Sequence, residues 1–202
     1  MNEEALVERA QRGDVQAYNQ LVLAYQQVAY NVAYRVLGDE ERAMDATQDA
    51  FFKGYRALLQ FRGGSFKAWI LRIVINACYD QLRHRQRRPQ TPLDDLIEND
   101  EHSRLFEDPA DSPENVVERQ EFDAVIQTAL DTLPEDQRVT VIMSDIEGMS
   151  YEEIAAATSV ALGTVKSRLS RGRARLRDFF REHQELLPSY LRLSAEFSNR
   201  SS

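Results

Sequence analysis

Two aspartates, Asp45 and Asp49, stand four residues apart with Gln48 between them, a spacing that puts all three side chains on one face of a helix. Carboxylates in that arrangement can hold a divalent cation or act as an acid–base pair. Both uses need further groups converging on the same place, and no histidine lies nearby to supply one. We therefore expect no catalytic residue, no metal and no cofactor.

Basic residues are concentrated in two short segments, 61–88 and 161–181, which together hold 14 of the chain's 25 lysines and arginines. Each segment contains one aspartate and is therefore net +6, whereas the rest of the chain is net −20. An acidic protein with two basic stretches is not typical of a general polyanion binder. The pattern indicates contact with nucleic acid at two defined places.

The composition, with 43% apolar and 29% charged residues among 202, is typical of a globular chain of one or two domains. A single cysteine, Cys78, excludes an internal disulfide and a cysteine-rich zinc site. It lies in an apolar helical pattern, so we expect a buried free thiol. The acidic N-terminus does not resemble a signal peptide and no apolar run is long enough to span a bilayer, so we expect a cytoplasmic protein.

Helical periodicity on both sides of a proline-rich acidic stretch predicts an all-α fold with two helical domains. The stretch carries four prolines and nine acids against one arginine, which is typical of a solvated linker. The expected divisions are a first domain at 1–88, a linker at 89–115, a second domain at 116–181 and a tail at 182–202.

In the first domain, Asp14 is placed to cap a helix that Gly38 ends. A second helix is expected over 40–60, and a long third helix follows Gly63 and Gly64. This third helix has an apolar stripe and a polar, largely basic stripe. We expect the apolar stripe to enter the core and the polar one to face outward.

In the second domain, Pro134 is placed at the first turn of a helix that ends near residues 147–148. A capping box follows at Ser150 and Glu153 and predicts a short helix. A longer helix then begins within a few residues and carries basic side chains on its outer face. Short helix, turn and basic helix together are the pattern of a helix-turn-helix.

Several segments closely resemble the extracytoplasmic-function sigma factors, a group of the bacterial sigma-70 family. Residues 133–138, 147–155 and 163–169 resemble the family's region 4, residues 45–51 resemble region 2.2, and residues 61–69 with Asn76 resemble regions 2.3 and 2.4. The resemblance covers about residues 5–88 and 116–180, in the family's order and spacing.

This resemblance implies a sigma factor without enzymatic activity of its own. Such a subunit binds core RNA polymerase, recognises the minus-35 and minus-10 elements of promoter DNA and helps to open the duplex. It implies a first domain for polymerase docking and minus-10 recognition and a second domain for minus-35 recognition. Members of the family are often held inactive by an anti-sigma factor, and direct membrane insertion is not expected.

The resemblance also implies site residues for each partner. Those for the polymerase are Asp45, Gln48, Asp49 and Phe52. Those for the minus-10 element are Phe66, Trp69, Arg72, Asn76, Asp80, Arg83 and Arg87. Those for the minus-35 element are Thr164, Lys166, Ser167, Arg168, Ser170, Arg171 and Arg175.

Some alternatives stay open at the level of sequence. Trp69 is equally compatible with stacking on exposed bases and with a place in the core. Asp80 suits a cytosine amino group, or a salt bridge to Arg83 or His84. Ser159 stands where the family has a frequent glycine, which predicts some strain in the turn of the helix-turn-helix. The rival function is a stand-alone helix-turn-helix regulator that binds an operator as a dimer, and a third class, a nucleic-acid-processing enzyme, lacks a ligand set.

Overall fold

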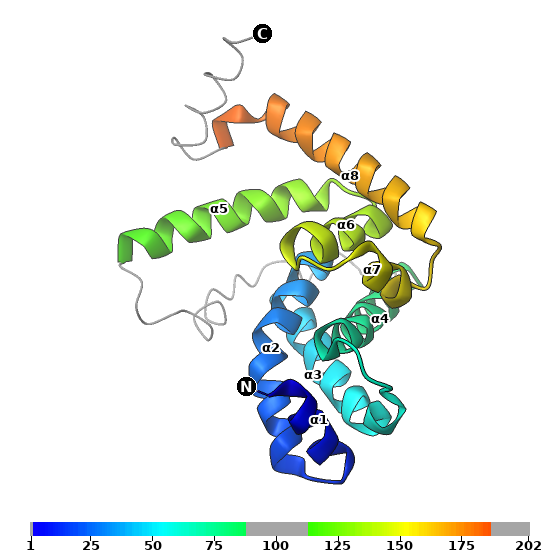
Figure 1. The fold of residues 1–202 in the computed structure, drawn as a ribbon. Coiled ribbons are helices and arrows are strands. Elements are labelled where there is room, and N and C mark those ends of the chain that lie inside the picture. The colour runs from blue at the N-terminus through cyan, green and yellow to red at the C-terminus, as the bar shows by residue number, and fades with distance from the viewer. Residues whose placement is uncertain (1, 88–112, 187–202) are drawn as a thin grey trace.

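A computed structural model describes residues 2–87 and 113–186, and every regular element in those ranges is helical (Figure 1). The first domain consists of α1 (Glu3–Gln11), α2 (Val15–Leu37), α3 (Glu40–Ala57), the 3₁₀ turn η1 (Leu58–Gln60) and α4 (Phe66–Arg87). The second consists of α5 (Pro113–Asp131), α6 (Glu135–Val141), the π-helical turn η3 (Ile142–Ile146), α7 (Tyr151–Thr158), α8 (Leu162–Glu182) and the 3₁₀ turn η4 (Gln184–Leu186). The all-α fold predicted from the sequence is confirmed.

Helix ends in the first domain follow the predicted signals. The Asp14 carboxylate accepts a hydrogen bond from the amide of Ala17 at 3.1 Å and caps α2. This bond is the main reason why the pKa of Asp14 lies below its ordinary value, with the nearby Arg9 contributing next. Gly38 ends α2 in the left-handed conformation, with φ of 67°.

Helix α1 was not predicted individually, because it offers only three buried residues, Leu6, Val7 and Ala10, as a periodic signal. It begins where the Asn2 side chain accepts from the amide of Ala5 at 3.2 Å. The helix packs against α2 (Figure 1). The position of α1 therefore depends on its packing against α2 more than on its own apolar periodicity.

The core of the first domain lies between α2, α3 and α4, which pack closely on one another. The small residues of α3 make this possible, since Ala43, Ala46 and Ala50 are buried and bring the neighbouring backbones near. Gly54 is the extreme case: a methyl group there would lie 2.9 Å from Ile70 Cδ1 and 3.0 Å from the Tyr18 hydroxyl oxygen. The close approach of these two side chains favours glycine at this position.

In the second domain, Pro134 immediately precedes α6, and the π-helical turn η3 extends that helix to Ile146. The capping box predicted at Ser150 and Glu153 is present in full at the start of α7. Ser159 then ends α7 in the left-handed conformation with φ of 57° and is the one non-glycine residue with positive φ among the described residues. The strain predicted for this turn has its origin there.

Helix α5 starts at Pro113 and so includes the last residues of the stretch 89–115 that was predicted as a linker. Proline is favoured at the first helical position, where its missing amide hydrogen costs nothing. The rest of the stretch predicted as a linker, and the tail beyond Leu186, lie outside the described residues. The two domains pack directly on each other, α4 against α7 and α2 against α6 and η3 (Figure 1).

Candidate docking and nucleic-acid surfaces

The exposed face of α3 carries the predicted docking residues. Asp45, Gln48 and Asp49 are all exposed, and Asp49 forms an ion pair of 2.7 Å with Lys53, one turn further along the helix. Phe52 lies on the same side with 56% of its surface exposed, and the guanidinium of Arg56 sits 4.2 Å above the centre of its ring. Acid, amide and aromatic side chains thus share one solvent-facing surface.

Sequence analysis did not identify the apolar continuation of this surface. Tyr55 on α3 and Leu59 on η1 are 41% and 72% exposed. Tyr55 also packs on Tyr18, with the ring centres 4.9 Å apart, so its position is fixed. Exposed apolar side chains that cluster beside a charged face are typical of protein–protein contact sites. The sequence offered little sign of this exposure, because apolar residues of a helix are by default expected to pack into the core of the protein.

The polar stripe of α4 faces solvent as predicted. Arg72, Asn76, Asp80 and Arg83 are exposed, while the opposite stripe, including Leu71, Val74, Ile75 and Cys78, is buried. The Asp80 carboxylate accepts from Arg83 at 2.5 Å, so one of the two alternatives for Asp80 is realised in this conformation. Arg87 belongs to the last turn of α4, and its side chain lies outside the described part.

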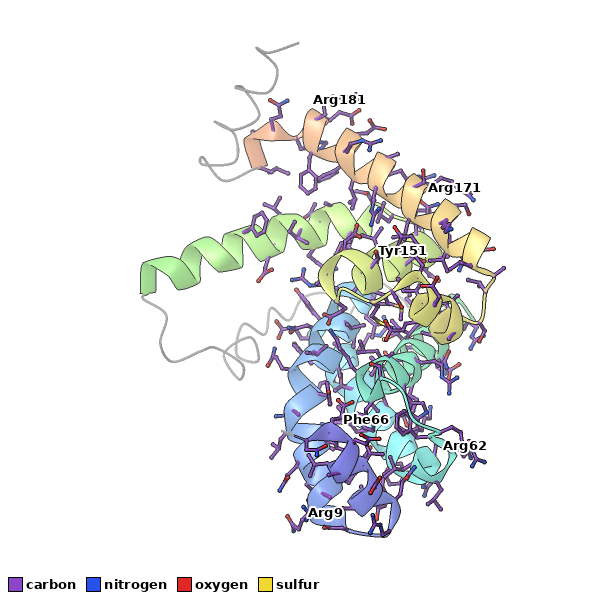
Figure 2. All side chains as sticks on the ribbon, in the orientation of Figure 1. Arg9, Arg62, Phe66, Tyr151, Arg171 and Arg181 are labelled. Carbon is purple, nitrogen blue, oxygen red and sulfur yellow. The ribbon has the colours of Figure 1, made fainter. Side chains whose placement is uncertain are left out.

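Phe66 and Trp69, the two aromatic residues assigned to minus-10 recognition, lie in one aromatic cluster at the start of α4. Phe66, which is labelled in Figure 2, is fully buried. It packs against Tyr25, Phe61 and Trp69, with ring centres 5.4–5.9 Å apart. Trp69 is half-buried, so part of its ring lies in the core and part remains accessible, and both alternatives stay compatible with its position. Only Trp69 of this pair presents surface in the present conformation.

Cys78 lies deep in this domain and is fully buried, as expected. Burial raises the pKa of its thiol to about 12. The group is therefore neutral at physiological pH and unreactive, since the thiolate is the reactive species. Cys78 is a core residue.

The outer face of α8 carries the second set of predicted DNA-contacting residues. Lys166, Ser170, Arg171 and Arg175 are exposed, and Figure 2 shows Arg171 directed away from the domain. Val165, Leu169 and Gly172 on the opposite side are buried against the domain, as predicted. Thr164 and Ser167 are half-buried. The amino end of α8 has no side-chain cap, so its first amide groups remain directed outward, an arrangement suited to a phosphate.

Two arginines of α8 are engaged within the second domain. Arg168, assigned to the minus-35 element, forms an ion pair with Asp136, with Nε 2.9 Å from Oδ2, and so ties α8 to the start of α6. Arg173 binds Asp145 through two hydrogen bonds of 2.9 and 2.5 Å. The latter pair is the main cause of a pKa of Asp145 below its ordinary value, and it raises the pKa of Arg173. These two arginines fix the orientation of α8.

A hollow of about 300 Å³ lies between α7 and α8. Its lining residues are Tyr151, Lys166, Leu169, Ser170, Arg173, Ala174 and Arg177. Three of the seven are cationic, so the hollow extends the positive surface of α8.

Among residues 2–87 and 113–186, no three histidine, cysteine or carboxylate side chains come together as a metal site. In the same ranges, no helix is long and apolar enough to cross a membrane.

Comparison with known proteins assigns the chain to a family. Residues 21–88 match the family described as Sigma-70 region 2, and residues 123–176 match Sigma-70, region 4. The RNA polymerase sigma-H factor of Pseudomonas aeruginosa is 40% identical over 176 residues, which cover 85% of this chain and 90% of that protein. The ECF RNA polymerase sigma-E factor of Escherichia coli K12 is 37% identical over 176 residues, covering 86% and 91%.

A solved structure agrees with these matches. The sigma factor RpoE of Bartonella quintana, determined in complex with the anti-sigma factor NepR, is 30% identical, with a TM-score of 0.62 over 81% of this chain and 96% of that one. The matches span both domains, so a stand-alone helix-turn-helix regulator is not favoured. The chain belongs to the extracytoplasmic-function group of the sigma-70 family of RNA polymerase sigma factors.

Proposed function

We propose that this sigma factor distributes promoter-specific initiation over three surfaces: α3 docks on core RNA polymerase, α4 recognises the minus-10 element and α8 recognises the minus-35 element. The observation that carries this division is the placement of the two basic segments. Each forms one long helix with a buried apolar side and an exposed cationic side. Cationic helix faces supply the electrostatic part of DNA binding, and polar residues among them supply sequence readout.

On α3, the acids and the apolar side chains have different roles in docking. Asp45 and Asp49 attract a basic surface and orient it, while Phe52, with Tyr55 and Leu59 beside it, supplies apolar area that becomes buried. Exposed aromatic residues contribute most of the affinity where they become fully desolvated. Gln48 adds a hydrogen-bonding group at the centre of the same face.

On α4, Asn76 and Asp80 read the minus-10 bases, while Arg72, Arg83 and Arg87 neutralise phosphates. The Asp80–Arg83 ion pair is exposed on both sides and so holds Asp80 only weakly, which leaves the carboxylate available to a cytosine amino group. Trp69 supplies an aromatic surface on which exposed bases of the opened DNA stack. Phe66 supports Trp69 from beneath.

On α8, the exposed Lys166, Ser170, Arg171 and Arg175 contact the minus-35 element directly. Thr164 and Ser167 lie near the amino end of the helix, where backbone amides also meet the DNA. Arg168 contributes by holding α8 on α6 through Asp136. Its role is to position the helix that enters the groove.

The chain acts by binding alone, without a catalytic step of its own, and works in the cytoplasm, where polymerase and promoter DNA are found. The Bartonella relative was solved with an anti-sigma factor, and the shared fold supports an anti-sigma partner for this chain as well. Capture of native partners on the tagged chain, followed by mass spectrometry, should recover core polymerase subunits together with one such protein. Recovery of neither would reject both assignments.

The docking assignment can be tested with a matched pair of charge reversals. Asp49 and Glu8 are both exposed carboxylates that pair with a basic residue four positions later, Lys53 and Arg12 respectively. Asp49→Arg should weaken the affinity for core polymerase at least tenfold with unchanged circular dichroism, because repulsion replaces attraction at an interface. Glu8→Arg on α1 should leave that affinity unchanged. Equal effects of the two reversals would remove the docking role of α3.

A second matched pair tests the apolar part of the face. Phe52→Ala removes a ring that is 56% exposed from the proposed interface, and Leu23→Ala removes an apolar side chain of α2 that is 67% exposed. We expect Phe52→Ala to cost about 1–2 kcal/mol of polymerase affinity and Leu23→Ala to cost none. The comparison separates docking from a general loss of apolar surface.

A further inference from the structure

Helix α1 binds the segment of chain that leads into α4. The Gln11 side chain, in the last turn of α1, donates from Nε2 to the carbonyl oxygens of Leu58 and Phe61, each at 3.0 Å. These acceptors lie 47 and 50 positions further along the chain. A side-chain amide has two donor hydrogens, so Gln11 can make both bonds at once. One side chain thus ties the end of α1 to η1 and to the residue that follows it.

The first turn of α1 binds the other end of the same segment. Glu3 Oε1 accepts from the amide of Phe66, the first residue of α4, at 3.4 Å, and the Tyr25 hydroxyl on α2 donates to Glu3 Oε2. The first amides of a helix have no partner within it, and a carboxylate also complements the positive pole of the helix dipole. Burial, with the neighbouring Glu3, raises the pKa of Tyr25 to about 12, so its hydroxyl remains a neutral donor at physiological pH.

The middle of this connection between η1 and α4 is not fixed by packing. Residues 62–65 are exposed, and Gly63 and Gly64 have φ of 95° and 90°. No described atom outside the adjoining residues lies within 4 Å of the place where a Cβ would stand on either glycine. Ser65 accepts from the amide of Ala68 at 3.1 Å, a local bond that caps α4 but does not tie the connection to another helix. Because glycine permits many backbone conformations, the path of the connection depends on the contacts at its two ends.

Both anchored residues pack on Trp69. The ring centre of Trp69 lies 5.4 Å from that of Phe61, with the planes inclined at 62°, and 5.4 Å from that of Phe66, with the planes at 40°. Trp69 is only half-buried, so these two rings set much of its orientation. Gln11 and Glu3 therefore act on Trp69 indirectly, through the residues whose backbone they bind.

We propose that α1 is a positioning element for minus-10 recognition, in which Gln11 and Glu3 hold Trp69 in the orientation that stacks on opened bases. The proposal rests on the stacking role given above for Trp69. Helix α1 makes no DNA contact of its own in this scheme. It raises the fraction of molecules whose aromatic cluster is ready to bind, and the apparent affinity for the opened minus-10 element falls in proportion when that fraction falls.

Trp69 is the one tryptophan of the chain, so tryptophan fluorescence reports on this cluster directly. Gln11→Met keeps the length and helix preference of the side chain but removes both donors. In the free, full-length chain, the emission maximum should move to longer wavelength and quenching by acrylamide should increase, because water and quencher reach the indole more often. Gln20→Met changes an exposed glutamine of α2 in the same way and should alter neither measurement.

A second pair of variants tests the other end of α1 and carries the test if Gln11→Met does not fold. Glu3→Gln replaces one of the two accepting oxygens by an amide nitrogen, whereas Glu4→Gln makes the same charge change at an exposed neighbour in the same turn. Glu3→Gln should shift the Trp69 emission and Glu4→Gln should not. Circular dichroism verifies the folding of each variant. A difference between the two reports the contacts of Glu3, since the charge of the helix end changes equally in both.

The functional arm uses holoenzyme reconstituted with core polymerase and a promoter that the unaltered holoenzyme selects from random duplexes. One DNA probe is a fork whose minus-10 element is single-stranded, and the other is a duplex that carries the minus-35 element alone. Gln11→Met should lower the affinity for the fork about three- to tenfold and leave the affinity for the duplex unchanged. A general loss of stability would instead weaken binding to both probes equally.

Three results would overturn the proposal: an unchanged emission in both Gln11→Met and Glu3→Gln, a shifted emission with unchanged affinity for the fork, or an equal loss on both DNA probes. The fluorescence measurement needs neither polymerase nor DNA, so this proposal and the proposed function fail in different ways. If the unaltered holoenzyme selects no promoter, the proposed function is wrong and the minus-10 role of α1 falls with it. The structural link between α1 and Trp69 is then still judged by the emission alone.

Discussion

Arg173 on α8 and Asp145 on η3 form a close ion pair, with two hydrogen bonds of 2.9 and 2.5 Å between guanidinium and carboxylate. A bidentate pair fixes both position and angle. It therefore holds the helix assigned to the minus-35 element against the turn that precedes the helix-turn-helix. Arg173 is therefore engaged within the domain, although the sequence presents it as equivalent to the neighbouring arginines of α8.

The pair predicts a pH-dependent contribution to stability. Its hydrogen bonds keep the pKa of Asp145 below 3.8, so the stabilisation is present above that value and is lost as the pH falls through the folded-state pKa. Asp145→Asn should cost about 0.5–1 kcal/mol at pH 7, a modest figure because solvent screens the partly exposed pair. Thermal unfolding from pH 7 down to about pH 3 should show the difference from the unaltered chain shrinking. Asp178→Asn, in an exposed pair within α8, is the control and should have little effect at any pH.

Ser159 predicts a gain in stability. It holds φ of 57°, which a side chain with a Cβ adopts at a cost that glycine avoids. Ser159→Gly should raise the free energy of unfolding by about 0.5–1 kcal/mol. Thr158→Gly, one residue earlier inside α7, should lower it by a similar amount. A loss of stability at both positions in chemical denaturation would mean that the turn is not strained.

Gly54 and Gly163 predict opposite responses to the same substitution. Both lie inside helices, where alanine is favoured by about 1 kcal/mol. At Gly54 the new methyl group would meet Ile70 at 2.9 Å, whereas at Gly163 nothing lies within 4 Å. Gly54→Ala should therefore destabilise the chain by about 1–2 kcal/mol and Gly163→Ala should stabilise it. Thermal unfolding measures whether each substitution raises or lowers the stability. A stabilising effect of Gly54→Ala would show that α3 and α4 can move apart to accommodate the methyl group.

Arg171 and Arg175 predict different DNA-binding defects. Arg171 lies near the middle of the exposed face of α8 and donates to Ser167, while Arg175 lies one turn further along. Arg171→Ala should cost about 1–3 kcal/mol on the preferred minus-35 sequence and flatten the preference at one base pair. Arg175→Ala should weaken binding to all sequences alike and reduce the salt slope by about one.

The measurement is promoter binding by reconstituted holoenzyme across minus-35 variants at several salt concentrations. A change of sequence preference from Arg175→Ala but not from Arg171→Ala would mean that α8 lies in the groove in a different register from the one proposed here.

Much of the fold was determined locally and could be predicted from the sequence. Asp14, Gly38 and the Ser150–Glu153 capping box set helix ends through bonds made within a few residues, and all three were found where expected. The apolar stripe of α4 also became core as predicted, because a spacing of three and four places side chains on one face whatever the helix packs against. Helix α1 was not predicted, because its three buried residues give only a weak periodic signal.

The sequence by itself determined which residues are basic, where they gather and which helix face they share, since these depend only on order and periodicity. The tertiary structure decided which of these side chains remain available for contact with a partner. It turned Arg168 toward Asp136 and Arg173 toward Asp145, buried Phe66 beneath Trp69, and joined Lys67 to Glu147 across 80 positions of chain. Such pairings depend on how whole helices cross, and local spacing carries no information about a partner so distant. For the same reason, the contact between the two domains could be found only in the folded chain.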